Sequence, residues 1–283
     1  MADINRSAFL PAQISKDIIQ QTQTASAVMA LARQVSLPGT GVAIPVITGD
    51  PTAEWVAETG KKPVSNSEVV SKLLRPYKIA VIETVSKELV RDADALYAAL
   101  AQRLPNALAK AFDNTVIGGT VAPGSDFDTF AAATAQDIST GTYAALVAAD
   151  GDVTAHGGIV NGYAIAPQGR SILLGAVDAD GRPLFINNAA EGAVPVILGA
   201  KTVMSKGLYK ADASGNIVGV VGDWSQAVYG TVEGIQISVS DQATLDIGGG
   251  NTINLWQQNM VAIRAEMEIG FRANTDVFNL LTD

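Results

Sequence analysis

The fold is decided by one stretch, residues 54–119, which opens with EWVAETGKKP (54–63), EVVSKLLR (68–75) and KIAVIETVS (78–86). The first two runs flank a polar turn that contains Gly60 and Pro63, so they predict a long hairpin. The third run is rich in β-branched residues and predicts a strand. We therefore expect a hairpin followed directly by a strand.

The end of this stretch predicts one long helix, from about residue 94 to 117. Apolar residues recur every four positions among alanines, at Leu96, Leu100, Leu104, Leu108, Phe112 and Val116. This spacing gives one apolar stripe, and at about 1.5 Å per residue the helix would be roughly 36 Å long. Asp92 or Asp94 can cap its start, and Gly118-Gly119 its end. Pro105 predicts a kink or two abutting helices.

A hairpin, a strand and a long helix in this order resemble the major capsid proteins of tailed bacteriophages, the Hong Kong 97 type of shell subunit. The match also rests on three local phrases, Pro76-Tyr77-Lys78, Val85-Ser86-Lys87-Glu88-Leu89 and Phe112-Asp113. The resemblance implies an α+β fold, in which the hairpin lies across an adjacent subunit and the helix is the spine of a peripheral domain. It divides the chain into an N-terminal arm (1–46), an extended hairpin loop (47–76), a peripheral domain with its spine helix (77–128 and 207–283) and an axial domain (129–206).

The arm contains a helical pattern from Ile14 to Val35, where apolar residues fall on one side at steps of three and four. Two interpretations stay open. The helix either packs on its own core or docks along a neighbouring subunit, and the resemblance favours the second. Its polar face is nearly uncharged, which does not indicate a helix at a membrane surface.

The axial segment alternates short strands and helices. A helix is expected from residues 139–142 through about Ala149, a strand at 163–166, a helix opening at 167–169 and a buried strand at 195–198. This order predicts a compact α/β unit. The resemblance implies that the unit meets its copies around pentamer and hexamer axes.

The chain after Lys206 is rich in β-forming residues. Residues 234–240 alternate apolar and polar side chains, and 246–252 are expected to form a flexible loop. The strongest alternation lies in 261–272, where one face is apolar, which predicts a long strand half buried against a helix. The resemblance implies that this strand and residues 276–280 return to the peripheral domain.

Composition narrows the function classes. The chain has 283 residues, no cysteine and a formal charge of −9, which excludes disulfides and argues against a high-affinity reader of nucleic acid. No run of residues suits a membrane span, and no basic-then-apolar signal opens the chain, so we expect a soluble intracellular protein without a membrane partner. Only 17% of residues are charged, which is consistent with large areas covered by other copies.

Motifs of catalysis or cofactor binding are missing from the sequence. His156 is the only histidine, and we expect an ordinary loop residue, because a triad needs more than one histidine. No phosphate loop and no dinucleotide fingerprint are present. The carboxylate pairs at 150–152 and 178–180 lack calcium-loop spacing and are explained by turns. We therefore expect no catalytic, cofactor or metal residue.

The expected function is a non-enzymatic shell subunit that assembles as pentamers and hexamers around double-stranded DNA, in the virion, after assembly in the bacterial cytoplasm. One alternative is an encapsulin-like compartment that encloses an enzyme. Another is an α/β enzyme without a recognisable motif. Candidate subunit-contact residues are Ile18, Val28, Trp55, Lys61, Lys62, Arg75 and Trp224.

Further partners follow from the resemblance. Members with a fused scaffolding segment carry a long extension before the arm, whereas Met1 here lies close to the arm, so we expect a separate scaffolding protein or none. A portal protein is also expected, and a decoration protein stays open. Some shells of this type join a hairpin lysine to an asparagine of a neighbour. For Lys61 and Lys62 the favoured interpretation is instead that the charges keep an exposed hairpin soluble.

Overall fold

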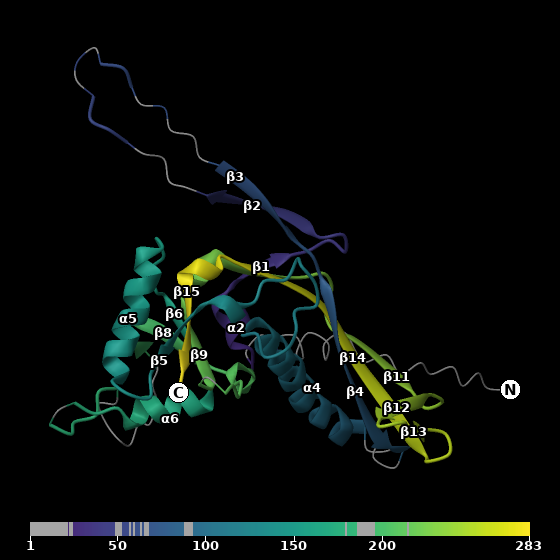
Figure 1. Ribbon diagram of the computed structural model, residues 1–283. Helices are drawn as coiled ribbons and strands as arrows, with labels where there is room; N and C mark the ends of the chain where they lie inside the picture. The colour runs from purple at the N-terminus through teal and green to yellow at the C-terminus, as the bar shows by residue number, and fades with distance from the viewer. Residues whose placement is uncertain are drawn as a thin grey trace.

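A computed structural model gives the structure of the chain and describes residues 22, 25–48, 53–56, 58, 60–62, 64, 68–87, 93–178, 180–185, 196–213 and 215–283. Helices and strands are mixed along these residues. Their strands form two larger sheets and two separate two-stranded hairpins (Figure 1). The predicted α+β fold class is confirmed.

The predicted long helix is α4, Ala93–Val116. It continues through Pro105 as one helix, so the alternative of two abutting helices is wrong. The apolar stripe is buried wherever its side chains are described, at Leu104, Leu108, Phe112 and Val116. The four-residue spacing therefore identified the buried side of the helix.

The first larger sheet packs against α4 and is built around a 14-residue strand, β14, Met260–Ala273. The alternation that predicted this strand is confirmed, because every odd-numbered residue from 261 to 271 is buried. β14 pairs along one side with β4 and along the other with two shorter strands, and a parallel strand completes the sheet at its edge. The partners of β14 in this sheet are β4 (Tyr77–Ser86), β11 (Gln236–Ser240), β10 (Ala227–Thr231) and, beside β10, β1 (Arg33–Ser36).

The N-terminal helix ends earlier than the sequence predicted. α2 spans Ala27–Leu31, and the chain then enters β1, where Val35 pairs with Gly230 of β10. The prediction of a helix up to Val35 is therefore wrong. The β-branched side chain of Val35 suits a strand better than a helix. The start of the predicted helix lies outside the described residues.

The extended hairpin consists of β2, Val42–Thr48, and β3, Glu68–Leu74, paired antiparallel from Val42–Leu74 to Thr48–Glu68. The prediction placed its first strand at 54–59, which is wrong, because the described residues there form no strand. Pro45 disguised the real strand, since proline cannot donate to a ladder. β2 tolerates it as one strand of a two-stranded ribbon. The expected boundary between arm and hairpin at residue 47 falls inside β2.

The second larger sheet is the axial sheet, with six strands. The predicted α/β unit is present, but its sheet also takes in β9 and β15, which the prediction had assigned to the peripheral domain. The division into domains itself stays a prediction. The elements of this unit are η1 (Phe130–Ala132), β5 (Thr134–Asp137), α5 (Thr142–Ala155), β6 (Gly162–Ile165), α6 (Pro167–Gly175), β7 (Val196–Ile197), β8 (Ala200–Met204), η2 (Lys206–Leu208), β9 (Ile217–Gly222), η3 (Trp224–Gln226), η4 (Thr275–Val277) and β15 (Phe278–Thr282).

A second small hairpin replaces the loop expected at residues 246–252. β12 (Thr244–Gly248) pairs antiparallel with β13 (Asn251–Asn254). Gly248, Gly249 and Gly250 have φ values of 85°, 66° and 78°. Only glycine adopts such left-handed angles without strain, so the three glycines form the turn of this hairpin.

The two larger sheets share a core of aromatic rings. Phe130 stacks on Phe278 with ring centroids 4.4 Å apart, and Trp224 meets Phe278 edge-on at 5.2 Å. The Trp224 side chain is 2% exposed, and its Nε1 donates to the Gly162 carbonyl at 2.9 Å. Val28 of α2 is fully buried in the same core. The expectation that Val28 and Trp224 contact a neighbouring subunit does not fit their burial inside this one.

Candidate functional site

The hairpin of β2 and β3 projects beyond both larger sheets (Figure 1), and among the described strands these two pair only with each other. Past the paired residues, Trp55 is fully exposed and Val64 is 85% exposed. Lys61 and Lys62 are exposed as well. A two-stranded hairpin is at best marginally stable in water without a surface to pack on. The hairpin therefore offers a contact surface that its own subunit leaves uncovered.

Arg272 of β14 joins the root of the hairpin to the body of the subunit. Its Nη1 donates to Asp128 Oδ1, its Nη2 to Asp126 Oδ1 and its Nε to the Leu73 carbonyl, each over 2.8 Å. Its side chain is 13% exposed. A planar guanidinium can serve three acceptors in fixed directions. Arg272 thus links β3, β14 and the loop after α4 through one group.

Two more basic side chains, one in β3 and one directly after it, lie near the carboxylates of Asp126 and Asp128. Lys72 Nζ lies 3.8 Å from Asp128 Oδ2, and Arg75 Nε lies 3.7 Å from Asp126 Oδ2. Both cations are partly exposed, so each pair alone contributes little. Together with Arg272 they hold the root at several points. We call Lys72, Arg75, Asp126, Asp128 and Arg272 the hairpin-base cluster.

Close backbone packing supports this cluster. A Cβ atom at Gly270 of β14 would collide with the Arg75 carbonyl, and a Cβ at its ladder partner Gly230 would collide with the Leu37 side chain. Glycine at both positions lets the segments that flank the hairpin approach the sheet. The hairpin root is therefore fixed by shape as well as by charge.

A second junction ties α2 to α4. The buried carboxylate of Asp113 accepts from Ser26 Oγ at 2.6 Å, from the Ala27 amide at 3.1 Å and from the Val28 amide at 3.4 Å. Ser205 also hydrogen-bonds to it. Burial raises the pKa of Asp113 to about 6, and these hydrogen bonds oppose the rise. Asp113 thereby caps the first amide groups of α2 from another helix.

This arrangement of hairpin, spine helix and two sheets matches known proteins over nearly the whole chain. A sequence profile described as the phage capsid family matches residues 7–276.

The chain belongs to the phage capsid family.

Individual relatives agree with this membership. The "Probable major capsid protein gp17" of Mycobacterium phage L5 is 36% identical over 97% of this chain and 89% of the relative. The protein of the same description from Mycobacterium phage D29 is 32% identical over 97% and 90%. A solved structure from Microbacterium phage Oxtober96 superposes with a TM-score of 0.71 at 25% identity and covers 91% of each chain. The predicted family is confirmed, and the enzyme alternative is not favoured.

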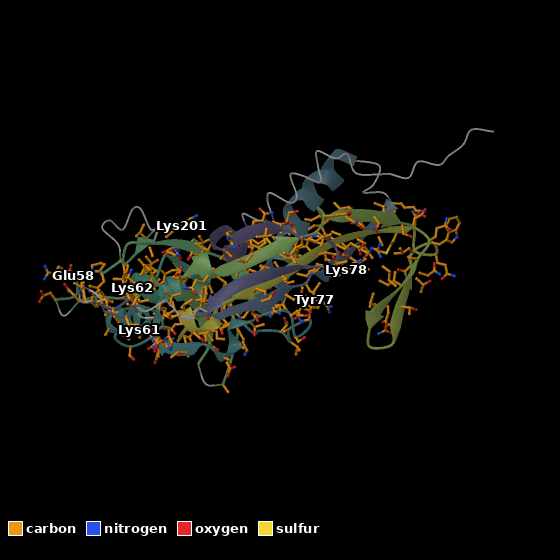
Figure 2. All side chains as sticks on the ribbon, turned by 90° about the horizontal axis from the view of Figure 1, so that it is seen from above. Glu58, Lys61, Lys62, Tyr77, Lys78 and Lys201 are labelled. Carbon is orange, nitrogen blue, oxygen red and sulfur yellow. The ribbon has the colours of Figure 1, made fainter. Side chains whose placement is uncertain are left out.

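The sequence-predicted contact residues of this capsid-family chain fall into three groups. Trp55, Lys61 and Lys62 are exposed on the hairpin, and Arg75 is exposed at its base. Val28 and Trp224 are buried in the core, as described above. Ile18 lies outside the described residues. Figure 2 shows Glu58, Lys61 and Lys62 together at one end of the molecule, far from Tyr77 and Lys78.

The one histidine, His156, makes a local contact with Asp152 one helical turn earlier. His156 Nδ1 lies 2.9 Å from the Asp152 carbonyl oxygen at the end of α5, and the imidazole is half exposed. Within the described residues, no three His, Cys, Asp or Glu side chains are grouped so that they could hold a metal ion. In the same part of the chain, none of the helices has the length and apolar character to cross a membrane.

Sequence reasoning missed both junctions. Arg272 stood out only as a polar residue on the outward face of an alternating strand, and Asp113 only as part of the phrase Phe112-Asp113. One signal for Asp113 was available. It breaks the apolar side of α4 directly beside Phe112, and a carboxylate at such a position needs donors from another segment.

Proposed function

We propose that this chain is the major capsid protein of a tailed phage, a subunit that self-assembles into the icosahedral head shell around a double-stranded DNA genome. The hairpin carries the proposal, because its strands pair only with each other in the described chain and its Trp55 is fully exposed. A surface of this kind requires a cover in the working assembly. The relatives' description as major capsid proteins supports another copy of the chain as that cover.

In the assembly we propose, the hairpin of one subunit lies across its neighbour and the axial unit meets its copies around five-fold and six-fold axes. Such contacts are heterologous and close by rotation into pentamers and hexamers. The contact energy is then distributed over the hairpin, the arm and the axial unit. No residue acts as an enzyme in this role.

The proposal includes other gene products of the phage. A separate scaffolding protein would guide closure, a portal would occupy one vertex, and a decoration protein could cover the finished shell. The subunit would enclose DNA without reading its sequence, which agrees with a net charge of −9. The finished protein would reside in the virion.

Electron microscopy and sedimentation velocity test this function directly. The purified chain, alone and co-expressed with the genes that flank its own, is expected to give closed particles or rings of five or six subunits. A persistent monomer or dimer under both conditions would overturn the proposal. The contents of closed particles separate the phage head from a protein compartment, because a head fills with DNA and a compartment with an enzyme.

A hairpin deletion tests the proposed role of its tip. Replacing residues 53–64 by a short glycine-containing turn leaves β2, β3 and the hairpin-base cluster in place. We expect soluble, folded subunits that form no closed shell. Shells in normal yield from this variant would contradict the proposed role.

A further inference from the structure

A pocket of about 430 Å³ opens between the middle of α4 and the short helical turn η2. Asn106, Ala107 and Lys110 line it from α4, and residues 204–207 line it from the end of β8 and from η2. Ala25, which precedes α2, lines it as well. We call it the α4–η2 pocket. Its lining is separate from the hairpin, from the hairpin-base cluster and from the sheet around β14.

Lys110 and Lys206 bring two positive charges to the α4–η2 pocket, and its lining contains no carboxylate. Both lysines are exposed. Among the described residues, neither ammonium group lies within ion-pair distance of a carboxylate. The chain as a whole has a formal charge of −9, so a generally basic surface does not explain the pair. The pocket is a local positive site on an acidic protein.

Close packing brings the two lysines together. Gly207 packs against the side of α4 that carries Lys110, because a Cβ atom at Gly207 would lie 3.0 Å from the Lys110 Cα and 2.8 Å from its carbonyl oxygen. Lys206 is the residue directly before Gly207. Two ammonium groups on such close backbone segments repel each other, and an anion between them removes the repulsion. The arrangement therefore favours a negatively charged ligand.

The carboxylate nearest to Gly207 does not pair with these lysines. The Cβ position of Gly207 lies 2.8 Å from the Asp113 Cβ, so Asp113 is directly behind η2. Its carboxylate is fully buried and accepts from the Ser26 hydroxyl and from the amides of Ala27 and Val28. Asp113 is also not part of the pocket lining. Its oxygens serve donors inside the subunit, and the two lysines stay available to a ligand from outside.

The charges of the pocket suit an oxyanion of the phosphate class. Lysine binds phosphate as a point charge, and a phosphate monoester carries about 1.5 to 2 negative charges at pH 7, enough for both lysines. In nucleic acid, phosphates recur about every 3.4 Å along each strand, so two neighbouring phosphates can take one lysine each. Apolar side chains in the lining, those of Ala25, Ala107 and Met204, lower the local dielectric constant and strengthen the attraction.

We propose that the α4–η2 pocket binds an oxyanion of the phosphate class through Lys110 and Lys206. The site goes beyond the proposed function, and a single subunit is sufficient to form it. Two sources present the same chemistry, the free phosphate ion and the backbone of double-stranded DNA. Contact of one subunit with DNA would be weak and independent of sequence, and the many copies in a shell would add their contributions.

Amide NMR of unassembled subunits tests the site with inorganic phosphate, at an ionic strength held constant with chloride. Saturable shifts are expected at the amides of Lys110, Lys206 and Gly207. Lys110→Gln with Lys206→Gln should weaken phosphate binding about tenfold or more, whereas Lys110→Arg with Lys206→Arg keeps both charges and should stay within about threefold. The matched control is Lys61→Gln with Lys62→Gln, which removes the same charge from two adjacent exposed lysines outside the pocket and should leave phosphate binding unchanged. Circular dichroism checks that each variant folds.

A second titration, with a short double-stranded DNA, identifies the source. DNA should shift the same amides, and loss of both lysines should reduce the slope of log affinity against log salt by about 2. Shifts with phosphate and none with DNA would assign the site to the free ion. A glutamate-rich peptide serves as competitor. Displacement of phosphate by this peptide at lower concentration than by DNA would overturn the phosphate class and assign the pocket to an acidic protein segment.

These outcomes are distinguishable from a failure of the proposed function. No saturable shift with phosphate, or equal phosphate binding by the wild-type chain and the double glutamine variant of Lys110 and Lys206, would overturn the site and leave the shell proposal intact. Absence of shells or rings from the wild-type chain would remove the proposed function and leave the site intact.

Discussion

Ser26 and Asp113 are 87 positions apart, and the Ser26 hydroxyl donates to the Asp113 carboxylate over 2.6 Å in the buried interior. Ser26 Oγ also accepts from the Met29 amide at 3.1 Å, so the same side chain caps its own helix. The start of α2 is thus fixed to the spine helix by one carboxylate. In the proposed shell, this junction determines where the N-terminal arm leaves the subunit.

Asp113 should make the folded subunit more stable at acidic pH than at neutral pH, which is the opposite of the usual effect of a carboxyl group. Burial raises its pKa in the folded state from 3.8 to about 6. The folded state then binds the proton more tightly than the unfolded state, so this contribution is complete below pH 4 and is lost as pH rises through 6. Urea unfolding of wild type and Asp113→Asn should show their free-energy difference falling by on the order of 3 kcal/mol between pH 4 and pH 7.

Asp137→Asn is the matched control for this slope. Hydrogen bonds from Ser139 lower the pKa of the Asp137 carboxyl. Its contribution is therefore present at neutral pH and is lost as pH falls, which is the opposite direction. A difference between wild type and Asp113→Asn that does not change with pH would contradict the assigned pKa.

Arg272 should be hard to replace even by lysine. An ammonium group cannot serve Asp126, Asp128 and the Leu73 carbonyl in fixed directions, so Arg272→Lys should lower the free energy of unfolding by about 1–2 kcal/mol. Amide hydrogen exchange near Leu73 should also accelerate. The control is Arg264→Lys on the same face of β14. Arg264 is 50% exposed with one ion pair at 3.6 Å, so this change should stay within about 0.5 kcal/mol. Equal effects of the two substitutions would contradict the role of the cluster.

The sequence predicted the elements whose pattern is local. α4 and β14 each bury one side at a constant period, and both were found within a few residues of their ends. β2 was missed because Pro45 interrupts a run that would otherwise read as a strand. β12 and β13 were missed because three glycines resembled a flexible loop rather than a hairpin turn.

Long-range pairing could not be predicted in the same way. β15 lies between β5 and β9 in the axial sheet, but no periodicity within residues 278–282 tells which sheet receives them. The functional residues also divide into those that a local pattern predicts and those that it does not. Turn chemistry placed Lys61 and Lys62 on an exposed tip, whereas the roles of Asp113 and Arg272 depend on partners far away in the chain.

Gly270 should not tolerate a methyl group. An alanine Cβ there would collide with the backbone carbonyl of Arg75, and a backbone atom cannot turn aside like a side chain. Gly270→Ala is expected to lower the free energy of unfolding by about 1–3 kcal/mol. Gly151→Ala inside α5 is the control, since nothing lies within 4 Å of its Cβ position. Alanine is the better helix former, so this control should be neutral or stabilise by up to about 1 kcal/mol. A neutral Gly270→Ala would show that the hairpin root is not tightly packed.

Substitution of Trp55 and of Trp224 should separate an effect on subunit contacts from an effect on the stability of the core. Trp55 is fully exposed, so Trp55→Ala should leave the free energy of unfolding unchanged within about 0.5 kcal/mol while it lowers the shell yield. Trp224 is buried against Phe278 and Phe130, so Trp224→Ala should lower the free energy of unfolding by about 3–5 kcal/mol. Thermal unfolding of the subunits and electron microscopy of assembly mixtures measure the two effects separately. If Trp55→Ala assembles normally, the hairpin contacts its neighbour through residues other than Trp55.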